Sequence, residues 1–486
     1  MYKIRFGTDG WRAIIAQDFT VDNVKRVAYA TAQWVKNEAG KHADLKPVIV
    51  LGHDCRFGGE MFSLAVMQVM AQEGVHVMYH KGIATTPMVS LGTHDFKCFA
   101  GVVVTASHNP PAYSGYKLKS FYGGPTKPDD VALVESHIPD HTIDVPNVSL
   151  EDLCASGDVS LVDLEKHYLE KVEGYFDLDA IRKSKLRVAY DAMFGAGFPV
   201  FKKILPEATM LHAELNPGFN GQAPEPIAKN LQEFGAMLAK DHHDIGFATD
   251  GDADRIGLVK GNGEILDAHH AILILLHILK EYKKYDGTVI AAFSATPKVK
   301  TLCEHHKLNL EVTKIGFKHI SGRMIEVDSI IGCEESGGIA VKGHIPERDG
   351  IWDALLVIEH LAQTGKSLED LIQEIYAITG SLAYNRNDMH LTNELKLATM
   401  ERCASGEFNE KFGKYTIDYI EDIDGFKFHF KEGGYVMIRP SGTEPVLRVY
   451  AESATMDLVD EILSEASRVI QAVSYTHLTL PTSYAV

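Results

Sequence analysis

Cysteine is scarce and scattered in this chain of 486 residues. Its six cysteines are widely spaced, and no two of them form a C-x-x-C motif. This pattern argues against a disulfide framework and against a zinc site built on cysteine pairs, and it is typical of free thiols in a reducing cytosol.

Long apolar runs are also missing. The most apolar stretch, residues 271–279, is too short to span a bilayer and contains His277, so it predicts a buried helix. The first ten residues carry no apolar core of the kind that a signal peptide needs. We therefore expect a soluble, cytoplasmic protein that does not enter a membrane.

Positive charge is in deficit, because 48 Lys and Arg residues face 66 Asp and Glu residues, giving a net charge of −18. This balance disfavours a broad nucleic-acid-binding surface, since phosphate backbones need a positive partner. A few local arginines can still bind an anionic small molecule. Hydrophobic residues make up 45% and charged residues 23%, which is ordinary for a folded protein, and the length predicts three or four domains.

Several common catalytic motifs are absent: there is no P-loop, no G-x-S-x-G and no H-E-x-x-H. The paired histidines at 242–243, 269–270 and 305–306 are poor two-point metal ligands, because neighbouring residues diverge on a helix. We interpret them as surface or core-edge residues.

Apolar runs bounded by turns alternate with helical periodicity over most of the chain. This alternation predicts strands that are buried on both faces and connected by helices. Strands are expected at 47–51, 75–79, 101–105, 186–191, 244–249, 288–293 and 329–332, and helices at 21–36 and 62–72.

The last part of the chain has a different pattern. Residues 418–435 contain three glycines and predict β-hairpins, and residues 456–472 predict a closing helix, which together indicate an α+β unit. A polar, proline-containing stretch near 139–157 is interpreted as the first linker. Residues 473–486 have no helical period and resemble a translated sequencing adapter, so we expect them to be non-native.

The expected fold class is therefore α/β, with three α/β domains followed by one α+β domain. The expected domain ranges are 1–145, 160–265, 266–380 and 384–472, with the tail at 473–486.

Residues 105–110, T-A-S-H-N-P, follow a predicted strand. Small polar residues at the carboxyl end of a parallel strand lie where α/β sites form. Ser107 would then be an exposed hydroxyl beside a basic residue, His108, and Lys117 could handle a proton. The alternative is an ordinary turn serine.

Residues 249–255, T-D-G-D-A-D-R, carry three carboxylates at alternate positions. Asp250, Asp252 and Asp254 can converge on one hard cation, Mg²⁺ or Ca²⁺, and would otherwise repel and raise each other's pKa. An EF-hand fails, because its sixth position would be Arg255 instead of Gly and its twelfth position lacks Glu. The alternative is a solvated acidic turn.

Two segments suit hydrogen bonding to a polyol. Residues 332–338, G-C-E-E-S-G-G, combine carboxylates and a hydroxyl among glycines, and residues 344–350, H-I-P-E-R-D-G, add cationic side chains. On its own, the first of these segments is also typical of a plain turn.

Phosphate-binding chemistry is concentrated in residues 439–445, R-P-S-G-T-E-P, with Arg448 beyond them. Guanidinium groups and the backbone N–H groups of a glycine-containing loop can hold an anion, although a surface turn is the alternative. Arg12, in F-G-T-D-G-W-R, is a further anion candidate, whereas we interpret residues 54–56, D-C-R, as structural.

Taken in order, these motifs resemble those of the α-D-phosphohexomutase superfamily, which contains phosphoglucomutases, phosphomannomutases and phosphoglucosamine mutases. The resemblance extends from Phe6 to about Ala472. It implies three related α/β domains with mixed sheets and a C-terminal α+β domain around a central active-site cleft, with one motif from each domain. It also implies interconversion of hexose 1-phosphate and hexose 6-phosphate through a phosphoserine and a hexose 1,6-bisphosphate.

The resemblance assigns roles to individual residues. Ser107 would carry the phosphoryl group and, with the three aspartates, hold Mg²⁺. Arg12 and Arg255 would stabilise the transferring phosphoryl group, and His108 and Lys117 would lie beside the serine, Lys117 as general acid/base. The metal ligands would be Ser107, Asp250, Asp252 and Asp254, and the substrate-binding residues would be Glu334, Ser336, His344, Arg348, Arg439, Ser441, Gly442, Thr443 and Arg448.

Departures from the family pattern bear on the sugar. Phosphoglucosamine mutases usually have E-Q-S-G-H in the sugar loop and bacterial phosphomannomutase/phosphoglucomutases E-M-S-G-H, whereas this chain has E-E-S-G-G. Gly338 thus removes a second acid/base from that position, and E-E-S resembles the glucomutase type.

We therefore expect glucose phosphates as substrates, with phosphomannomutase or phosphoglucosamine mutase activity as the alternative. A metal-dependent sugar phosphatase and a non-catalytic sugar-phosphate sensor are remote alternatives. The expected partners are small-molecule sugar phosphates, without nucleic acid or membrane, bound by a monomer or homodimer.

Overall fold

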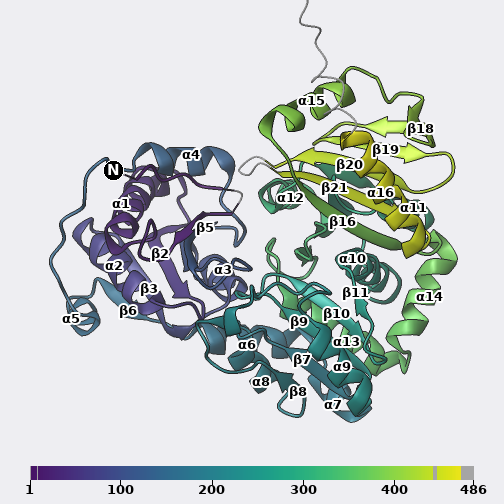
Figure 1. Cartoon of the computed structure of the whole chain (residues 1–486). Helices are drawn as coiled ribbons and strands as arrows, with labels where there is room; N and C mark the ends of the chain where they lie inside the picture. Colours follow the sequence, from purple (N-terminus) through teal and green to yellow (C-terminus); the bar gives the residue numbers. More distant parts are fainter. Residues whose placement is uncertain (1, 8, 442–445, 472–486) are drawn as a thin grey trace, which may run out of the picture. The chain divides into compact units, whose positions relative to one another are not determined.

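The computed structural model describes residues 2–7, 9–441 and 446–471. The described chain forms two compact units (Figure 1). The first comprises Met1–Val312 and Gly316–Gln373, and the second comprises Thr313–Ile315 and the chain from Glu374 onward. The expected non-native tail, residues 473–486, lies outside the described residues.

The first sheet of the first unit has six strands, of which β4, β2, β3 and β6 are parallel. The strand β5 runs antiparallel to β4 and also pairs with β1. In spatial order the strands are β1 (Trp11–Ile14), β5 (Tyr113–Ser120), β4 (Cys98–Val104), β2 (Lys46–His53), β3 (His76–Ile83) and β6 (Val159–Leu161).

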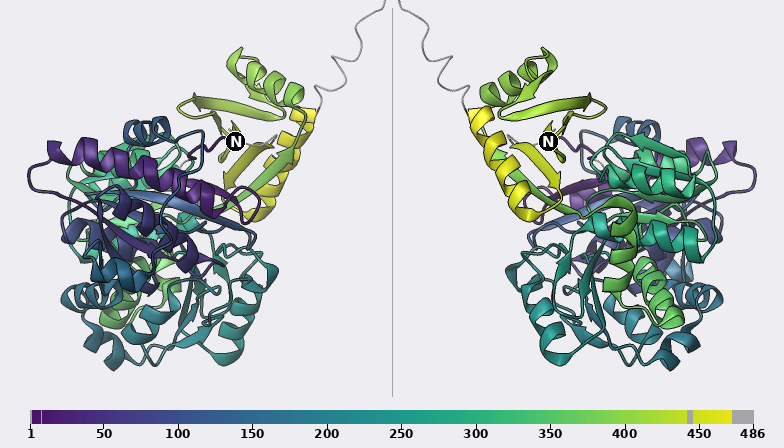
Figure 2. Two further views of the ribbon diagram at one scale, coloured as in Figure 1. Left: turned by 90° about the vertical axis from the view of Figure 1, so that its left-hand side faces the viewer. Right: turned by 90° about the vertical axis from the view of Figure 1, so that its right-hand side faces the viewer.

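Helices cover both faces of this sheet (Figures 1 and 2). The helices α1 (Val21–Glu38) and α2 (Gly59–Gln72) contribute apolar residues to the same core as alternate residues of the strands. The helix α3 (Thr86–Asp95) packs on the other face, where a Cβ at Gly101 would meet its side chains. Alternation along the strands therefore divides the apolar residues between two helical layers.

The predicted linker at 139–157 is ordered and packs on the first sheet. This stretch contains the helix α5 (Leu150–Ala155), and Val145 and Leu153 are buried in the core of the first sheet. It leads into β6, which adds a strand to that sheet. The polar composition concealed a few apolar anchors that are sufficient to pack the segment. The helix α4 (Pro128–Ser136) precedes it and packs on α1.

The second sheet is also mixed. The strand β7 is parallel to β8 and β9, whereas β10 is antiparallel to both β9 and β11. In spatial order the strands are β11 (Ile265–Leu266), β10 (Ile256–Lys260), β9 (Ile245–Thr249), β7 (Val188–Asp191) and β8 (Thr209–Leu211). The helices of this part are α6 (Leu164–Tyr175), α7 (Leu178–Ser184), α8 (Phe198–Ile204) and α9 (Gln232–Asp241), with a short 3-10 turn at Phe219–Gly221.

The third sheet repeats the arrangement with four strands, of which β12 and β14 are parallel and β15 is antiparallel to β14. In spatial order they are β13 (Leu310–Thr313), β12 (Thr288–Ala292), β14 (Ser329–Cys333) and β15 (Ile339–Val341). The helices are α10 (Ala268–His277), which continues as a π-helix at Ile278–Tyr282, α11 (Lys298–His306), α12 (Phe317–Met324), α13 (Gly350–Thr364) and α14 (Leu368–Thr379).

The helix predicted at 271–279 is confirmed as a buried one, because the residues of α10 from His269 to His277 are buried. No helix in the described residues is long and apolar enough to cross a membrane. All six cysteines lie in the described chain, and each is a free thiol.

The second unit carries a six-stranded antiparallel sheet, which confirms the predicted α+β unit. The strands are β16 (Ala383–His390), β21 (Val446–Ser453), β20 (Tyr435–Pro440), β19 (Phe426–Phe430), β18 (Tyr415–Glu421) and β17 (Lys411–Phe412), and the helices are α15 (Asn393–Ala404) and α16 (Met456–Gln471). Apolar residues of α16, such as Val459 and Ile462, pack on one face of the sheet. The other face carries Arg386 and Tyr450, which are in contact.

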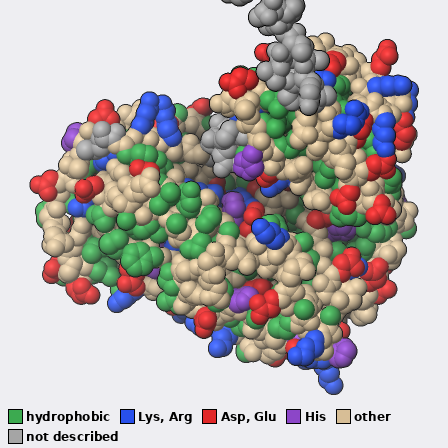
Figure 3. Space-filling model, in the orientation of Figure 1, with side chains coloured by type: hydrophobic (Ala, Val, Ile, Leu, Met, Phe, Trp, Pro, Cys, Tyr) green, Lys and Arg blue, Asp and Glu red, His purple; other side chains and the backbone are tan. Residues whose placement is uncertain are grey.

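The surface carries mixed charge. On the face drawn in Figure 3, Lys and Arg side chains are interspersed with Asp and Glu side chains and form no continuous basic patch. This distribution agrees with the net charge of −18.

Candidate active site

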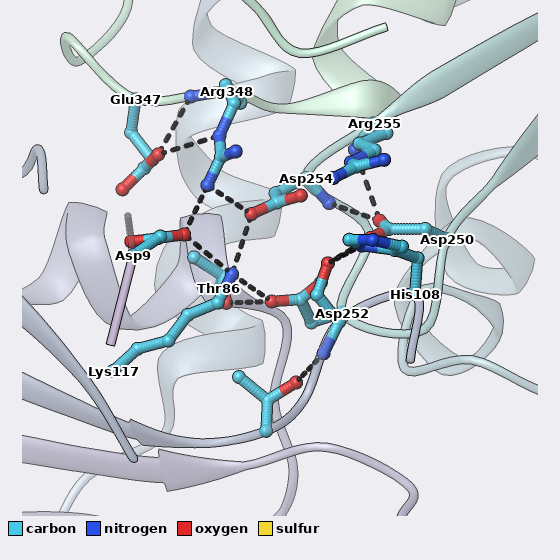
Figure 4. A network of polar contacts seen from close by, with 12 residues as sticks. Asp9, Thr86, His108, Lys117, Asp250, Asp252, Asp254, Arg255, Glu347 and Arg348 are labelled. Carbon is cyan, nitrogen blue, oxygen red and sulfur yellow. Dashed lines mark hydrogen bonds and ion pairs between the residues drawn. The ribbon is translucent and has the colours of Figure 1, made fainter. Parts of the chain in front are cut away.

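Three loops of the first unit bring the predicted chemical groups together. One loop follows β4 and contains Ser107, the second follows β9 and contains the three aspartates, and the third follows β14. Each thus begins at the carboxyl end of a strand in its own sheet, which is where α/β proteins place their sites. The loops meet in a network of polar contacts (Figure 4).

Ser107 lies directly against the aspartate loop. Its Oγ donates a hydrogen bond to Asp250 Oδ2 at 2.5 Å, and His108 Nδ1 lies 3.3 Å from the same Oγ. The expectation of an exposed hydroxyl is wrong, because Ser107 is only 1% exposed. The loops approach so closely that a Cβ at Gly251 would lie 2.5 Å from the Ser107 carbonyl oxygen, so the glycine between the aspartates is required.

The three aspartates form a buried cluster, not a solvated turn. One ligand atom from each of Asp250, Asp252 and Asp254 lies within 4.8 Å of the others, and all three residues are fully buried. Burial, followed by the two neighbouring carboxylates, raises the pKa of Asp250 well above its ordinary value. Its Oδ1 accepts hydrogen bonds from the backbone N–H groups of Asp254 and Arg255, which fixes the loop.

The cluster fits a divalent metal ion. Asp252 Oδ1 and Asp254 Oδ1 are buried and have no hydrogen-bond partner among the described residues. A buried carboxylate oxygen without a donor is costly, and a hard cation would satisfy both oxygens. The donor set consists only of oxygen atoms, which is the set that Mg²⁺ and Ca²⁺ prefer.

Lys117, on β5, extends into the aspartate cluster. Its Nζ lies 2.7 Å from Asp252 Oδ2, 2.8 Å from Asp254 Oδ2 and 3.0 Å from Asp9 Oδ2. Burial alone would lower the pKa of Lys117, but the three carboxylates outweigh it and raise the pKa above the ordinary value. In this arrangement Lys117 is an ammonium group that donates hydrogen bonds to Asp252 and Asp254.

Arg348 is a second cation inside the same network. It pairs with Asp9, lies 2.6 Å from Asp254 Oδ2 and lies 3.3 Å from Glu334 Oε1. Only 5% of its side chain is exposed. The predicted substrate residue therefore lies between the aspartate loop after β9 and the loop after β14.

Arg12 and Arg255 place positive charge beside Ser107. Arg12 Nη1 donates to Asn109 Oδ1 at 2.8 Å, and Arg255 Nη1 lies 3.5 Å from Glu225 Oε1. Burial, followed by these two arginines, lowers the pKa of His108 well below its ordinary value. His108 is therefore a neutral imidazole at neutral pH.

This arrangement predicts the titration of His108. Because burial and the arginines favour the neutral form, stability is lost as pH falls below the pKa near 6.5 of the unfolded state. We expect the imidazole signals of His108 in NMR spectra of wild type to change to those of the charged form only at a pH well below 6.5. His42, an exposed histidine in the same unit, serves as comparison. A His108 midpoint near 6.5 would contradict the arrangement.

The loop after β14, which is predicted to bind the sugar, is fixed by Glu334 and Arg348. Ser336 Oγ donates to Glu334 Oε1 at 2.8 Å, and burial raises the pKa of Glu334. A Cβ at Gly338 would lie 2.4 Å from Arg348 Cδ and 2.9 Å from Glu334 Oε1. Arg348 thus occupies the space that a side chain at position 338 would need.

His344 does not join this network. Its Nε2 lies 3.0 Å from Asp349 Oδ2, its ring stacks on Trp352, and 1% of its side chain is exposed. Asp349 begins α13 as its N-cap. These contacts are those of a core residue, so we remove His344 from the proposed substrate ligands.

The predicted phosphate-binding residues lie in the second unit. Arg439 on β20 and Arg448 on β21 are direct partners across the antiparallel pair, so their side chains share one face of the sheet. Arg439 Nε lies 3.4 Å from Asp424 Oδ2, and Ser441 N donates to the Val446 carbonyl at 2.9 Å. Gly442 and Thr443 lie outside the described residues.

Comparison with known proteins identifies the family. Four family models match in chain order: phosphoglucomutase/phosphomannomutase domains I, II and III and the C-terminal domain, at residues 3–142, 166–263, 267–378 and 393–469. The chain belongs to the phosphoglucomutase/phosphomannomutase family. It is an enzyme of the hexose-phosphate mutase type.

Relatives of this phosphoglucomutase/phosphomannomutase family member align over almost their whole length. It is 28% identical to a phosphoglucomutase/phosphomannomutase of Thermococcus kodakarensis, over 96% of this chain and 98% of that protein. It is 30% identical to a phosphoglucosamine mutase of Carboxydothermus hydrogenoformans, over 96% and 99%. A crystal structure from Thermus thermophilus, assigned as a phosphomannomutase, matches with a TM-score of 0.84 and 30% identity over 97% and 99%.

These names bear on the expected sugar. The relatives are named as mutases of glucosamine, mannose or glucose phosphates. Taken together, these names favour the alternative substrates, mannose and glucosamine phosphates, over the glucose phosphates expected from E-E-S. The coarser expectation, a hexose-phosphate mutase with three α/β domains and a C-terminal α+β domain, is confirmed.

Sequence reasoning missed three residues of this family member's network. Asp9 joins Lys117, Lys119 and Arg348. Thr86 Oγ1 donates to Asp252 Oδ2, and Glu347 pairs with Lys119. Asp9 lies in F-G-T-D-G and Glu347 in H-I-P-E-R, so both were visible inside segments selected for their arginines. Thr86 carried no signal, because Thr at a helix start is usually a cap.

Proposed function

We propose that this enzyme interconverts hexose 1-phosphates and hexose 6-phosphates through phosphorylated Ser107 and a hexose 1,6-bisphosphate. The observation that carries the proposal is the contact between Ser107 Oγ and Asp250 Oδ2 at 2.5 Å. A buried hydroxyl between a cation-binding carboxylate and basic side chains is a suitable phosphoryl carrier.

The side chains around Ser107 then have separate tasks. Arg12 and Arg255 neutralise the charge that spreads over the transferring phosphoryl oxygens. Lys117 donates a proton to the oxygen that leaves and takes it back in the reverse transfer. The buried position of Ser107 excludes water, which protects the phosphoserine from hydrolysis.

We further propose Mg²⁺ as the cofactor, held by Asp250, Asp252, Asp254 and the phosphorylated Ser107. When bound, it supplies positive charge that stabilises the transferring phosphoryl group. The two orphaned buried oxygens of Asp252 and Asp254 support this assignment. The hexose 1,6-bisphosphate acts as intermediate and activator, and a related fungal mutase has been crystallised with glucose 1,6-bisphosphate.

In the proposed sugar site, Glu334 and Ser336 hydrogen-bond the hydroxyls, with Arg348 beside them. We propose that Arg439, Ser441, Gly442, Thr443 and Arg448 hold the phosphate that is not being transferred. The cytoplasmic location and the monomeric or dimeric state stay predictions.

An assay of the purified enzyme tests this function and selects the sugar. Mannose, glucosamine and glucose 1-phosphates are supplied in parallel with Mg²⁺ and a trace of the matching 1,6-bisphosphate, and kcat/KM is compared. Formation of the 6-phosphate supports the mutase. Release of inorganic phosphate would indicate the phosphatase, and binding without turnover would indicate the sensor. The relatives' names favour mannose or glucosamine as the best substrate, and E-E-S favours glucose.

Arg439→Ala tests the phosphate-binding residues. Loss of a bidentate, charge-assisted contact costs roughly 1.5–3 kcal/mol, so we expect kcat/KM to fall by about 10–150-fold, mainly through KM. Turnover should also depend more on added bisphosphate, because the intermediate escapes more easily. Arg402→Ala, which removes an arginine paired with Glu407 in the same unit, is the control. Unchanged kinetics for Arg439→Ala would withdraw the assignment.

A further inference from the structure

A buried arginine outside the proposed reacting groups holds the loop that carries Ser107. Arg56 follows β2, the parallel neighbour of β4, so its segment lies beside the loop that follows β4. Arg56 is 3% exposed, and no motif of the proposed chemistry includes it. Burying a guanidinium group is costly unless its donors are satisfied.

The donors of Arg56 are satisfied almost entirely by the serine loop. Its Nη1 and Nη2 groups donate to four backbone carbonyl oxygens, and its Nε lies 3.3 Å from Asp54 Oδ2. The four carbonyl oxygens belong to Ser107 at 2.7 Å, Asn109 at 2.6 Å, Pro110 at 2.9 Å and Tyr113 at 2.9 Å. The Arg56 side chain thus donates hydrogen bonds to backbone carbonyl oxygens along the whole serine loop.

The same segment also fixes the other side of the Ser107 backbone. Ser107 N donates to Thr105 Oγ1 at 2.9 Å, and Thr105 Oγ1 donates to Asp54 Oδ2 at 2.5 Å. Because Asp54 also pairs with Arg56, both the N–H and the carbonyl of Ser107 are tied to residues 54–56.

This anchoring explains an unfavourable backbone conformation. Ser107 has a φ of 52°, in the left-handed region that side chains other than glycine avoid. Such a backbone conformation persists only where its surroundings determine it. Phe219, whose ring centroid lies 5.0 Å from the guanidinium carbon of Arg56, covers the arginine from the second domain.

We propose that Arg56 is a positioning residue for phosphoryl transfer, which holds the Ser107 backbone so that Oγ meets Asp250. This inference rests on the proposed function of Ser107. Arg56 acts through the loop and touches no reacting atom. Because displacement of a reacting group by about 1 Å can cost about 10²-fold in rate, loss of this anchor lowers kcat more than it raises KM.

The chain offers a matched control in Arg26, a second buried arginine of the same domain. Arg26 is 2% exposed, lies on α1 and donates to the backbone carbonyls of Tyr2 at 3.0 Å and Pro139 at 2.8 Å. These partners lie outside the serine loop. Substitutions of Arg26 and Arg56 therefore remove the same kind of buried interaction, with different consequences for Ser107.

The experiment compares Arg56→Lys with Arg26→Lys in the full chain. Lysine keeps the charge but cannot serve four carbonyls from a planar fork. We expect both variants to lose thermal stability, while only Arg56→Lys loses about 10²-fold in kcat with KM within about 3-fold of wild type. Thr105→Val removes the two hydrogen bonds of one hydroxyl group and should lose about 10-fold in kcat. This variant tests the proposal if Arg56→Lys does not fold.

Hydrogen exchange provides a readout that does not depend on activity. Backbone amides of residues 105–113 should exchange faster in Arg56→Lys than in wild type or Arg26→Lys. A wild-type kcat for folded Arg56→Lys, or unchanged exchange in this peptide, would overturn the positioning role. If wild type converts no hexose phosphate, the proposed function fails, and the exchange data still decide whether Arg56 holds the loop.

Discussion

Ser107→Ala should lower kcat by at least ~10³-fold, the scale of losing a covalent-catalysis group. That factor corresponds to about 4 kcal/mol in the activation barrier. The substitution removes one buried oxygen and leaves Asp250 without the hydroxyl that now lies 2.5 Å from it. The fold should survive, because alanine adds no volume and the loss of one hydrogen bond is small beside the stability of the whole domain.

Two measurements check this result. Steady-state assays give kcat, and incubation with labelled hexose 1,6-bisphosphate gives the amount of phosphoryl group retained per chain, which should be close to one for wild type and absent for Ser107→Ala. Ser63→Ala is the control, since Ser63 is equally buried but lies on α2. Wild-type turnover by folded Ser107→Ala would refute the covalent role.

Asp252→Asn should lower activity by at least ~10²-fold and weaken Mg²⁺ binding. The change keeps the shape but removes one ligand charge from a hard-cation site, and loss of supporting residues alone costs about 10–100-fold in metal affinity. It also removes the anion beside Lys117 Nζ at 2.7 Å. Calorimetric titration with Mg²⁺ measures the affinity, and activity against Mg²⁺ concentration measures the consequence.

Asp353→Asn is the matched control. Asp353 is 1% exposed in the same unit, and burial, followed by Asp349, raises its pKa well above the ordinary value. Asp353 does not belong to the aspartate cluster, so asparagine should replace it without loss of metal affinity. Full activity of wild type after complete removal of divalent ions by EDTA would refute the metal site.

The sequence predicted the chemical groups better than their surroundings. The spacing of Asp250, Asp252 and Asp254 indicated a cation site, and the described cluster fits one. The same pattern could not reveal that Lys117 and Arg348 enter the cluster, because they come from β5 and from the segment before α13. Contacts between residues far apart in the chain leave no local periodicity.

The misjudged residues show the same limit. Ser107 was expected to be exposed because a loop after a strand usually is, but a loop from another sheet covers it. His344 was selected for its charge, and its stacking on Trp352 could not be read from the sequence. The stretch 139–157 was predicted as a linker from its composition, which could not show that two buried side chains anchor it to the first sheet.

The sequence by itself determined the alternation of strands and helices, the change to an α+β unit at the end, and the residue types of the site. These features depend on local periodicity, turn residues and side-chain chemistry, all of which can be read from residues that are close together in the sequence. Only the tertiary structure decided which side chains meet: Asp9 with Lys117, Thr86 with Asp252, and Arg56 with the carbonyls around Ser107. The physical reason is that burial, unpaired oxygens and shifted pKa values arise when separate sheets pack their loops together, and packing over such distances in sequence is fixed by the whole fold.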